Sequence, residues 1–266
     1  MGFDDCLSLL MHSKGKKTAL VIGHPGHELR IYGIVELYKP RVYIITDGSG
    51  NSGHSRVYNS VKILEQSGAT MSPIAGYFTD KEIYRVILEN DFAALDTFIK
   101  TLWNDLQSHP IDTIIGDAIE GFNPTHDLCR YIINTLVRLL NKNRSTQLNN
   151  YDFLLDRMIT PDEETEAISL RLTNENFETK YTAAANYEEL AAELKMAIEK
   201  YGKEPFKTEY IRPVFPIDES KNWKDGIPYY EKYGLEKIKA GTYKQAITYT
   251  SHMKPIIEWL NQYSFD

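Results

Sequence analysis

Three histidines stand where a folded α/β chain could bring their imidazoles together. His24 and His27 come after an apolar run at residues 18–22 that is typical of a buried strand, and His126 comes after a second run at 112–117. Parallel strands place the residues beyond their carboxyl ends at one edge of the sheet, where open α/β folds bind ligands. One histidine at a strand end is usually an ordinary polar side chain, but three imidazoles with an open fourth position are the ligand set of catalytic zinc. We therefore expect these three histidines to bind Zn²⁺ or another divalent transition metal.

The sequence around the histidines alternates between strand-like runs and helical patterns. Strands are predicted at residues 18–22, 41–47, 73–78, 112–117, 151–155, 167–172 and 210–215. Helices are predicted at 28–37, 55–66, 81–89, 92–107, 125–141, 176–201, 228–239 and 243–262, with part of a helix at 7–11 and a loop at 216–228. This order predicts an α/β fold with a mostly parallel sheet and helices on both of its faces. We expect a single domain over residues 1–266, with the chain after residue 150 packed as an α/β appendage on the edge of the sheet.

Within the predicted helix at 55–66, Val57, Val61 and Leu64 recur at helical spacing and predict the buried face. Gly68 comes next as a C-terminal stop signal.

A glycine-rich turn, Gly48-x-Gly50-x-x-Gly53, lies between the strand at 41–47 and the next helix. It matches the dinucleotide-binding fingerprint, in which phosphates sit at a helix N-terminus. However, it does not open the sheet, and no Asp or Glu ends a strand about 20 residues later, as ribose binding requires. It could equally be a flexible loop that permits close backbone approach, or part of the rim of the histidine site, which is the interpretation that we favour.

The composition is that of an ordinary globular chain with an acidic excess. Among its 266 residues, 42% are hydrophobic and 25% are charged, and the formal net charge is -7. This balance argues against a nucleic-acid binder, which needs clustered Lys and Arg. The two cysteines lie far apart and predict no disulfide framework, and we find no signal peptide and no apolar run of about 18 residues. We expect a cytoplasmic protein without a transmembrane segment, and the sequence leaves open whether it forms a homo-oligomer.

Several short motifs resemble, in order and spacing, those of the LmbE-like (PIG-L) zinc-dependent N-deacetylases. The turn His24-Pro25-Gly26-His27-Glu28 is similar to the His-Pro-Asp-Asp-Glu signature of that family. Thr46-Asp47-Gly48 with Arg56 resembles its Thr-Asp-Gly turn and Arg-bearing helix, and Asn123-Pro124-Thr125-His126 resembles its His-Pro-Asp-His motif. The pattern from Tyr229 to His252 is similar to the C-terminal region of some members. The resemblance spans nearly the whole chain.

The resemblance implies a Rossmann-like fold and a hydrolase that removes an acetyl group from the amine of an amino sugar or sugar conjugate. The metal ligands of the family fall on His24, His27 and His126, so the middle ligand changes from carboxylate to imidazole, which zinc accepts. The acid–base positions depart further from the pattern. The general base of the family corresponds to Gly26, which has no side chain, and its auxiliary histidine corresponds to Asn123, which can donate to an oxyanion but cannot shuttle a proton.

Other polar residues at the predicted strand ends could supply the missing roles. Glu120 lies in the loop just before Asn123 and Asp127 adjoins His126, so either could orient water or a ligand imidazole. Asp117 ends its strand, and it is the residue that we favour as base or proton relay. Asp47 ends the neighbouring strand and is expected to orient a ligand imidazole, while Asn123 would help to hold the oxyanion. Arg56 and His54, beside the glycine-rich turn, are candidates for contacts with the sugar.

The sequence supports two classes of function. The first is a metal-dependent amide hydrolase acting on a small N-acyl sugar or sugar conjugate. The second is a non-catalytic descendant that binds metal or sugar in the same pocket, because the loss of an acid at Gly26 and of a histidine at Asn123 is what such a protein would show. An enzyme acting on a different acyl group or bond is a third interpretation. Metal content and amine release from N-acyl sugars distinguish among them.

Overall fold

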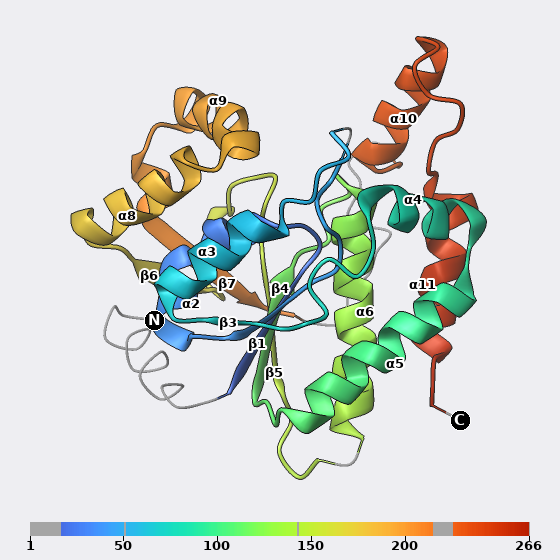
Figure 1. The fold of residues 1–266 in the computed structure, drawn as a ribbon, viewed down its shortest axis with the longest axis horizontal. Helices are drawn as coiled ribbons and strands as arrows, with labels where there is room; N and C mark the ends of the chain where they lie inside the picture. The colour runs from blue at the N-terminus through green and yellow to red at the C-terminus, as the bar shows by residue number, and fades with distance from the viewer. Residues whose placement is uncertain (1–16, 51, 143, 215–225, 266) are drawn as a thin grey trace.

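The computed structural model describes residues 17–50, 52–142, 144–214 and 226–265. They contain a seven-stranded sheet in the order β3-β2-β1-β4-β5-β7-β6 (Figure 1). The strands are β1 Thr18–Ile22, β2 Arg41–Ile44, β3 Thr70–Met71, β4 Thr113–Asp117, β5 Asn149–Phe153, β6 Ile168–Arg171 and β7 Thr208–Pro213. The strands β1 to β5 pair in parallel, whereas β7 is antiparallel to both β5 and β6. The predicted mostly parallel sheet is confirmed.

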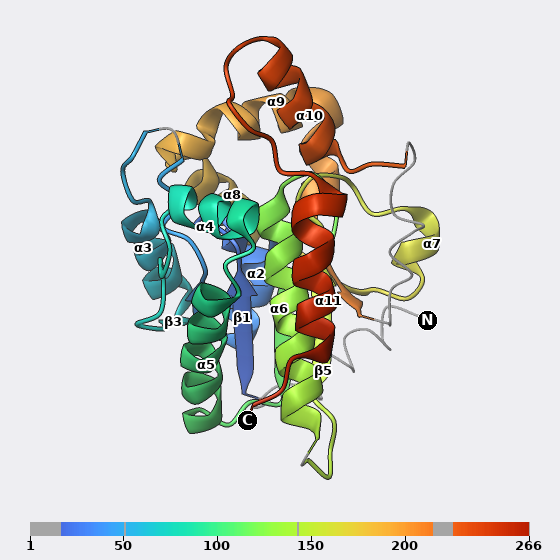
Figure 2. The same cartoon turned by 90° about the vertical axis from the view of Figure 1, so that its right-hand side faces the viewer.

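Helices cover both faces of the sheet (Figures 1 and 2). The α-helices are α2 Tyr32–Tyr38, α3 Val57–Ser67, α4 Asp80–Glu89, α5 Phe92–Ser108, α6 Pro124–Asn141, α7 Pro161–Glu164, α8 Asn174–Ala185, α9 Ala191–Tyr201, α10 Tyr229–Lys239 and α11 Lys254–Gln262. Shorter helical turns are η1 His27–Ile31, η2 Glu188–Leu190, η3 Glu204–Lys207 and the π-helical η5 Tyr249–Met253. No helix in these described ranges is long and apolar enough to cross a membrane.

Strand β1 contributes to two separate hydrophobic layers because alternate side chains of a strand point to opposite faces. Ala19 and Val21 pack in the layer that includes side chains of α5, α6 and α11. Leu20 and Ile22 pack in the opposite layer, which includes side chains of α2 and α3. This two-sided burial explains why the sequence of the strand is a continuous apolar run rather than an alternating one.

Several predicted elements differ from the structure. Residues 73–78 form no strand: β3 ends at Met71, and a turn containing Gly76, with φ 72°, intervenes before an isolated bridge between Phe78 and Thr46. The buried face of α3 consists of Ser60, Ile63, Leu64 and Ser67, so Val57 and Val61 were wrongly placed in it. The last predicted helix begins later than residue 243, where the Thr248 side chain accepts from the N–H of Ser251 and caps η5.

The predicted helix at 176–201 is two helices. It breaks after Ala185, and Tyr187 turns into a buried cluster with Leu29, Tyr32 and Ile63 before α9 resumes. Burial of one large aromatic side chain outweighs the continuation of the helix at this point.

The chain after residue 150 extends the edge of the sheet through β6 and β7, as predicted, but it does not end there. Its last helix, α11, returns to pack beside α6, and Ile256, Ile257 and Leu260 enter the main core. The predictions for residues 7–11 and for most of the loop at 216–228 lie outside the described residues.

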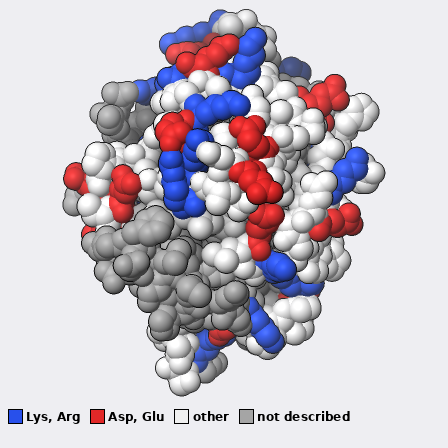
Figure 3. Space-filling view, turned by 90° about the vertical axis from the view of Figure 1, so that its left-hand side faces the viewer, with Lys and Arg blue, Asp and Glu red and all other residues white. Residues whose placement is uncertain are grey.

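On the face shown in Figure 3, basic and acidic side chains lie next to one another.

Candidate active site

The sheet topology brings the three predicted histidines together. β1 and β4 are neighbouring parallel strands, with Val21 paired to Gly116. η1, which begins at His27, comes after β1, and α6, which carries His126 in its first turn, comes after β4. The imidazole centroids of His24 and His27 lie 5.4 Å apart, those of His24 and His126 5.1 Å, and those of His27 and His126 4.5 Å. The three rings therefore contact one another edge to face.

The two ring nitrogens of His24 have different surroundings. Nδ1 lies 2.7 Å from Thr46 Oγ1 and 3.1 Å from Asp80 Oδ1. Burial lowers the pKa of His24 more than the contact with Asp80 raises it, so the ring is neutral. An ionised carboxylate can only accept, so Nδ1 carries the proton of this neutral ring and Nε2 carries the lone pair. That Nε2 is buried and has no hydrogen-bond partner among the described residues.

Asp80 remains a carboxylate at this position. Burial raises the pKa of Asp80, but the net pKa lies below its ordinary value, chiefly because Nδ1 of His24 donates to the carboxylate. Asp80 is the first residue of α4, and its Oδ2 also accepts from the N–H of Gly50 at 2.7 Å. The carboxylate thus joins the histidine cluster to the glycine-rich turn.

His27 is held in a corresponding way by Asp117. Its Nδ1 lies 3.0 Å from Asp117 Oδ2 and 3.1 Å from Oδ1, and Oδ2 also accepts from the N–H of Gly23 at 2.7 Å. Burial lowers the pKa of His27, but the buried Asp117 carboxylate outweighs this effect and the net pKa is raised. Beneath them, the buried guanidinium of Arg130 donates through Nε to the Asp117 carbonyl at 2.5 Å. Asp117 therefore fixes both His27 and the turn that carries it.

His126 faces a third carboxylate at longer range. Its Nδ1 lies 3.6 Å from Oδ2 of Asp156, beyond hydrogen-bond distance, and is buried. Burial, together with the nearby His27 and His24, lowers the pKa of His126 well below 6.5. Burial also raises the pKa of Asp156 to about 7, and Glu120 adds to this effect.

Acidic side chains also fix the loops around the cluster. Asp127 Oδ1 accepts from the N–H groups of Glu120 at 3.0 Å and Gly121 at 3.1 Å, and burial raises the pKa of Asp127 to about 8. The Glu120 carboxylate in turn accepts from the N–H groups of Leu155 at 2.6 Å and Asp156 at 3.1 Å. The loop after β4 thereby positions the loop after β5, which carries Asp156.

The donor chemistry of the cluster fits a divalent transition metal. Ligating histidines usually donate their second ring nitrogen to a carboxylate, as His24 and His27 do here, and His24 presents a buried nitrogen lone pair. With the side chains as they stand, however, no group of three His, Cys, Asp or Glu residues in the described ranges could hold a metal ion. Binding would therefore require the imidazoles to turn their nitrogens toward one common point.

Gly26 stands where the motif resemblance would place a general base, and its side-chain space is filled by another residue. Its φ is 103°, and a Cβ at this position would lie 2.5 Å from Cδ1 of Leu190 and 3.6 Å from Cε2 of Tyr187. The N–H of Gly26 donates to the buried carboxylate of Glu28 at 2.8 Å. A side chain can be added here only if the side chain of Leu190 shifts away.

The contacts of the predicted residues beside the glycine-rich turn are with the turn and with the start of α4. Asp47 Oδ1 accepts from the N–H groups of Ser49 at 2.9 Å and Asp80 at 3.3 Å, so it shapes the turn, while Asp80 is the carboxylate that contacts His24. Arg56 donates through Nε to the Gly48 carbonyl, and His54 is exposed. The turn itself reaches the site through the contact of Gly50 with Asp80.

Asn123 caps the helix that carries His126. Its Oδ1 accepts from the N–H of Thr125 at 2.8 Å, so donation through Nδ2 is the role that its amide can play toward a substrate.

The sequence did not reveal that Thr46, Asp80 and Asp156 face the histidines. A signal existed for Asp156, since it lies just beyond the end of β5 and so belongs to the same sheet edge as the residues beyond β1 and β4.

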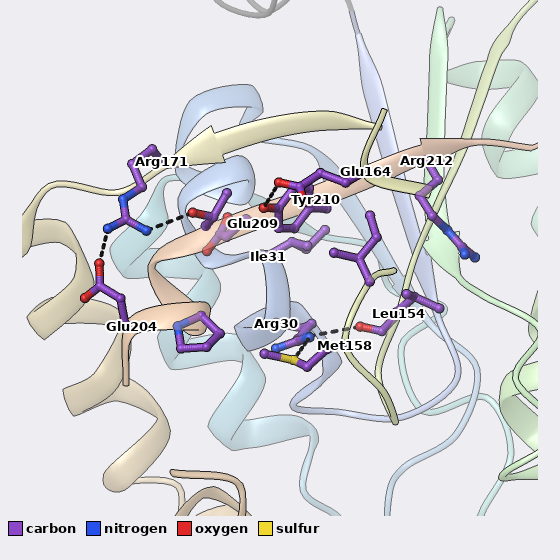
Figure 4. A pocket seen from close by; sticks show the side chains of 13 residues that line it. Arg30, Ile31, Leu154, Met158, Glu164, Arg171, Glu204, Glu209, Tyr210 and Arg212 are labelled. Atoms are coloured by element: carbon purple, nitrogen blue, oxygen red, sulfur yellow. Dashed lines mark hydrogen bonds and ion pairs between the residues drawn. The ribbon is translucent and has the colours of Figure 1, made fainter. Parts of the chain in front are cut away.

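A cavity of about 430 Å³ lies apart from the imidazoles, between η1, β6, β7 and the loop after β5 (Figure 4). Its three arginines are already engaged. Arg30 Nε donates to the Leu154 carbonyl at 3.0 Å, Arg171 pairs with Glu204, and Arg212 pairs with Asp152 and Glu163. Leu154 and Met158 in its wall come from the same loop as Asp156, so the cavity lies beside the loop that carries this residue.

No family model and no curated protein matches this sequence. Among solved structures, the fold is similar to that of the A40926 pseudoaglycone deacetylase Dbv21, with a TM-score of 0.52 and 14% identity over 75% of this chain and 97% of that chain. A deacetylase triple mutant of the teicoplanin biosynthetic pathway and the zinc inhibited form of teicoplanin deacetylase Orf2 each give a TM-score of 0.50 and 11% identity, over 77% of this chain and 100% of theirs. This chain therefore has the α/β fold that those deacetylases share.

Proposed function

We propose that this protein is a metal-dependent hydrolase that removes an acyl group from the amine of an N-acylated sugar or sugar conjugate. The observation that carries the proposal is the histidine cluster. The three imidazoles lie next to one another, and those of His24 and His27 each contact a carboxylate through Nδ1. Nε2 of His24 is buried and has no hydrogen-bond partner in the described part of the chain. The fold shared with the teicoplanin-pathway and A40926 pseudoaglycone deacetylases, together with the LmbE-like motifs, supports amide hydrolysis as the reaction.

The residues of the site divide into ligands and positioning groups. His24, His27 and His126 would hold the divalent ion, Zn²⁺ or another transition metal, which when bound supplies Lewis acidity toward water and the amide carbonyl. Asp80 and Asp117 hold the rings of His24 and His27 through Nδ1. The Nδ2 group of Asn123 would donate to the carbonyl oxygen as it gains charge. Arg56 and His54 would contact the sugar from the side of the glycine-rich turn.

We assign the proton transfer to Asp156 instead of Asp117. Both oxygens of the buried Asp117 carboxylate face His27, and one of them also accepts from a backbone N–H, so this residue acts as a positioning group. The Asp156 side chain is 19% exposed, and its Oδ2 faces the cluster. It can take a proton from the attacking water at Oδ2 and deliver it to the leaving amine. This role is the one that the position of Gly26 cannot fill.

A second candidate is a protein that binds metal or sugar without catalysis. The observation that favours it is Gly26, whose side-chain space is occupied by Leu190. Such a protein would retain metal on the histidines but release no amine from any N-acyl sugar.

The first test is metal content measured by mass spectrometry on protein purified without added metal. We expect about one ion per chain, lost in His24→Ala and His126→Ala and kept in a control variant at the exposed His109. Because a teicoplanin deacetylase is known in a zinc inhibited form, activity should be measured with Zn²⁺, Co²⁺ and Mn²⁺ over a range of concentrations. Metal retention and amine release that persist in both histidine variants would refute the proposal.

The second test separates catalysis from binding. Asp156→Asn should keep the metal and lower kcat for amine release by roughly 10²–10⁴-fold, as expected for loss of a general acid–base group. Metal retention in the unmodified protein without amine release from a broad panel of N-acyl sugars would favour the binding protein.

A further inference from the structure

A row of exposed aromatic side chains lies at the carboxyl end of the sheet. Phe122 and Tyr229 are stacked with centroids 4.9 Å apart and planes at 8°, and Tyr233 and Tyr243 continue the row at 6.0 Å and 6.4 Å. Their exposed fractions are 47%, 50%, 39% and 40%. We call these four residues the aromatic row. Large aromatic side chains are normally buried, so four adjacent exposed ones indicate a surface that meets a ligand.

The aromatic row connects to the histidine site at one end through the loop after β4. Phe122 directly precedes Asn123, the cap of the helix that carries His126. The same loop contacts α10 through the N–H of Tyr230, which donates to the Gly121 carbonyl at 3.1 Å. Helix α10, which carries Tyr229 and Tyr233, lies above α4 and the N-terminal end of α6 in Figure 1.

Helix α4 carries a further exposed aromatic side chain near the histidine site. Tyr84 is 37% exposed and lies one helical turn from Asp80, the residue that contacts His24.

The chemistry of the row selects among ligands. Binding of an alkyl chain is stabilised in proportion to the apolar area removed from water, so such a chain needs an enclosing groove. The aromatic row is instead open to solvent. A sugar ring places C–H groups against an aromatic face and keeps its hydroxyls in water. The tyrosine hydroxyls, and Lys237 with its Nζ 4.9 Å from the Tyr233 centroid, supply hydrogen-bonding groups beside the rings.

We propose that the aromatic row is a subsite that stacks further sugar rings of an N-acylated oligosaccharide or glycan conjugate whose acylated ring lies at the histidines. This inference rests on the proposed function, and it adds that the substrate is longer than one sugar.

The rate test compares N-acetylglucosamine with its β-1,4-linked tetramer in the metal-loaded enzyme. We expect the tetramer to have the higher kcat/KM, and Tyr229→Ala to remove roughly 3–10-fold of that advantage, the value of one aromatic stacking contact. Single-sugar rates should be unchanged. Tyr201→Ala, at a similarly exposed tyrosine at the end of α9, is the matched control and should leave the advantage intact. Equal kcat/KM for both substrates, or no effect of Tyr229→Ala, would overturn the subsite.

A binding test that needs no catalysis distinguishes this inference from the proposed function. Cellotetraose, a neutral tetrasaccharide without acyl groups, should bind the unmodified protein in calorimetry, and Tyr229→Ala and Tyr233→Ala should weaken it, while Tyr201→Ala should not. Such binding in a protein that releases no amine would support the subsite and refute the hydrolase. The opposite result would be that an octanoyl ligand binds in a way that depends on Tyr229 while the tetrasaccharide does not bind. That result would overturn the subsite in favour of an acyl-chain surface.

Discussion

Replacing Gly26 by Ala tests how the segment between α8 and α9 closes over the histidine turn. At φ 103° any L side chain is strained, which costs about 1–2 kcal/mol. The added Cβ would also lie 2.5 Å from Cδ1 of Leu190, an overlap that must be relieved by movement. Overpacking of this kind costs about 1–3 kcal/mol. We therefore expect Gly26→Ala to lower the free energy of unfolding by about 2–5 kcal/mol.

Two further variants separate strain from overlap. Gly53 has φ 71° and nothing within 4 Å of an added Cβ, so Gly53→Ala should carry only the strain, about 1–2 kcal/mol. Leu190→Ala removes the overlapping group, so Gly26→Ala combined with it should be less destabilised than the sum of the two single variants by about 1–3 kcal/mol. The assay is urea unfolding followed by circular dichroism. The contact with Leu190 would be refuted if the losses of unfolding free energy in the two single variants simply added in the double variant. It would also be refuted if Gly26→Ala and Gly53→Ala lost the same unfolding free energy.

Three other predictions concern charged groups that hold the fold and the site. Glu209→Ala should lower the free energy of unfolding by about 3–5 kcal/mol in urea unfolding, because it leaves the buried ammonium of Lys180, 2.8 Å away, without its partner. Arginine contacts lower the pKa of Glu163 from 4.5 to about 2, so its stabilisation is present above pH 4.5 and is lost as the pH falls toward 2. Because solvent screens this partly exposed group, we expect its contribution to the free energy of unfolding to be about 1–2 kcal/mol. Glu163→Gln should therefore show a smaller fall in Tm between pH 5 and pH 3 than the unmodified protein. Asp80→Asn should weaken metal affinity by about 10–100-fold in a chelator competition titration while the fold is kept, because it loosens the ring of His24; unchanged affinity would contradict this role.

The sequence predicted the parts of the site that depend on local pattern and on sheet topology. The apolar runs that became β1 and β4 are buried on both faces, and neighbouring parallel strands bring the residues beyond their carboxyl ends to one edge. His24, His27 and His126 could be placed at that edge for this reason. Their role as ligands stays a prediction.

The partners of the histidines could not be inferred from the sequence, because they depend on how distant helices dock. Asp80 directly precedes the predicted helix at 81–89, but nothing local indicates that its carboxylate lies 3.1 Å from His24. The break at Tyr187 was also hidden, since the residues on either side suit a helix and only the buried cluster around Leu29 favours the turn. That break is what carries Leu190 onto Gly26.

Although Gly26 has no side chain, the site does contain acidic groups. Asp156 faces His126 from the loop after β5, and Glu120 fixes that loop by accepting two of its N–H groups. Glu120 is itself fixed by Asp127, which lies next to His126 on α6. Of these three acids only Asp127 is buried, and the chain of contacts that starts from it keeps the partly exposed Asp156 carboxylate facing His126. We infer that the base lies at this strand end and not in the histidine turn, and this favours the hydrolase over the binding protein.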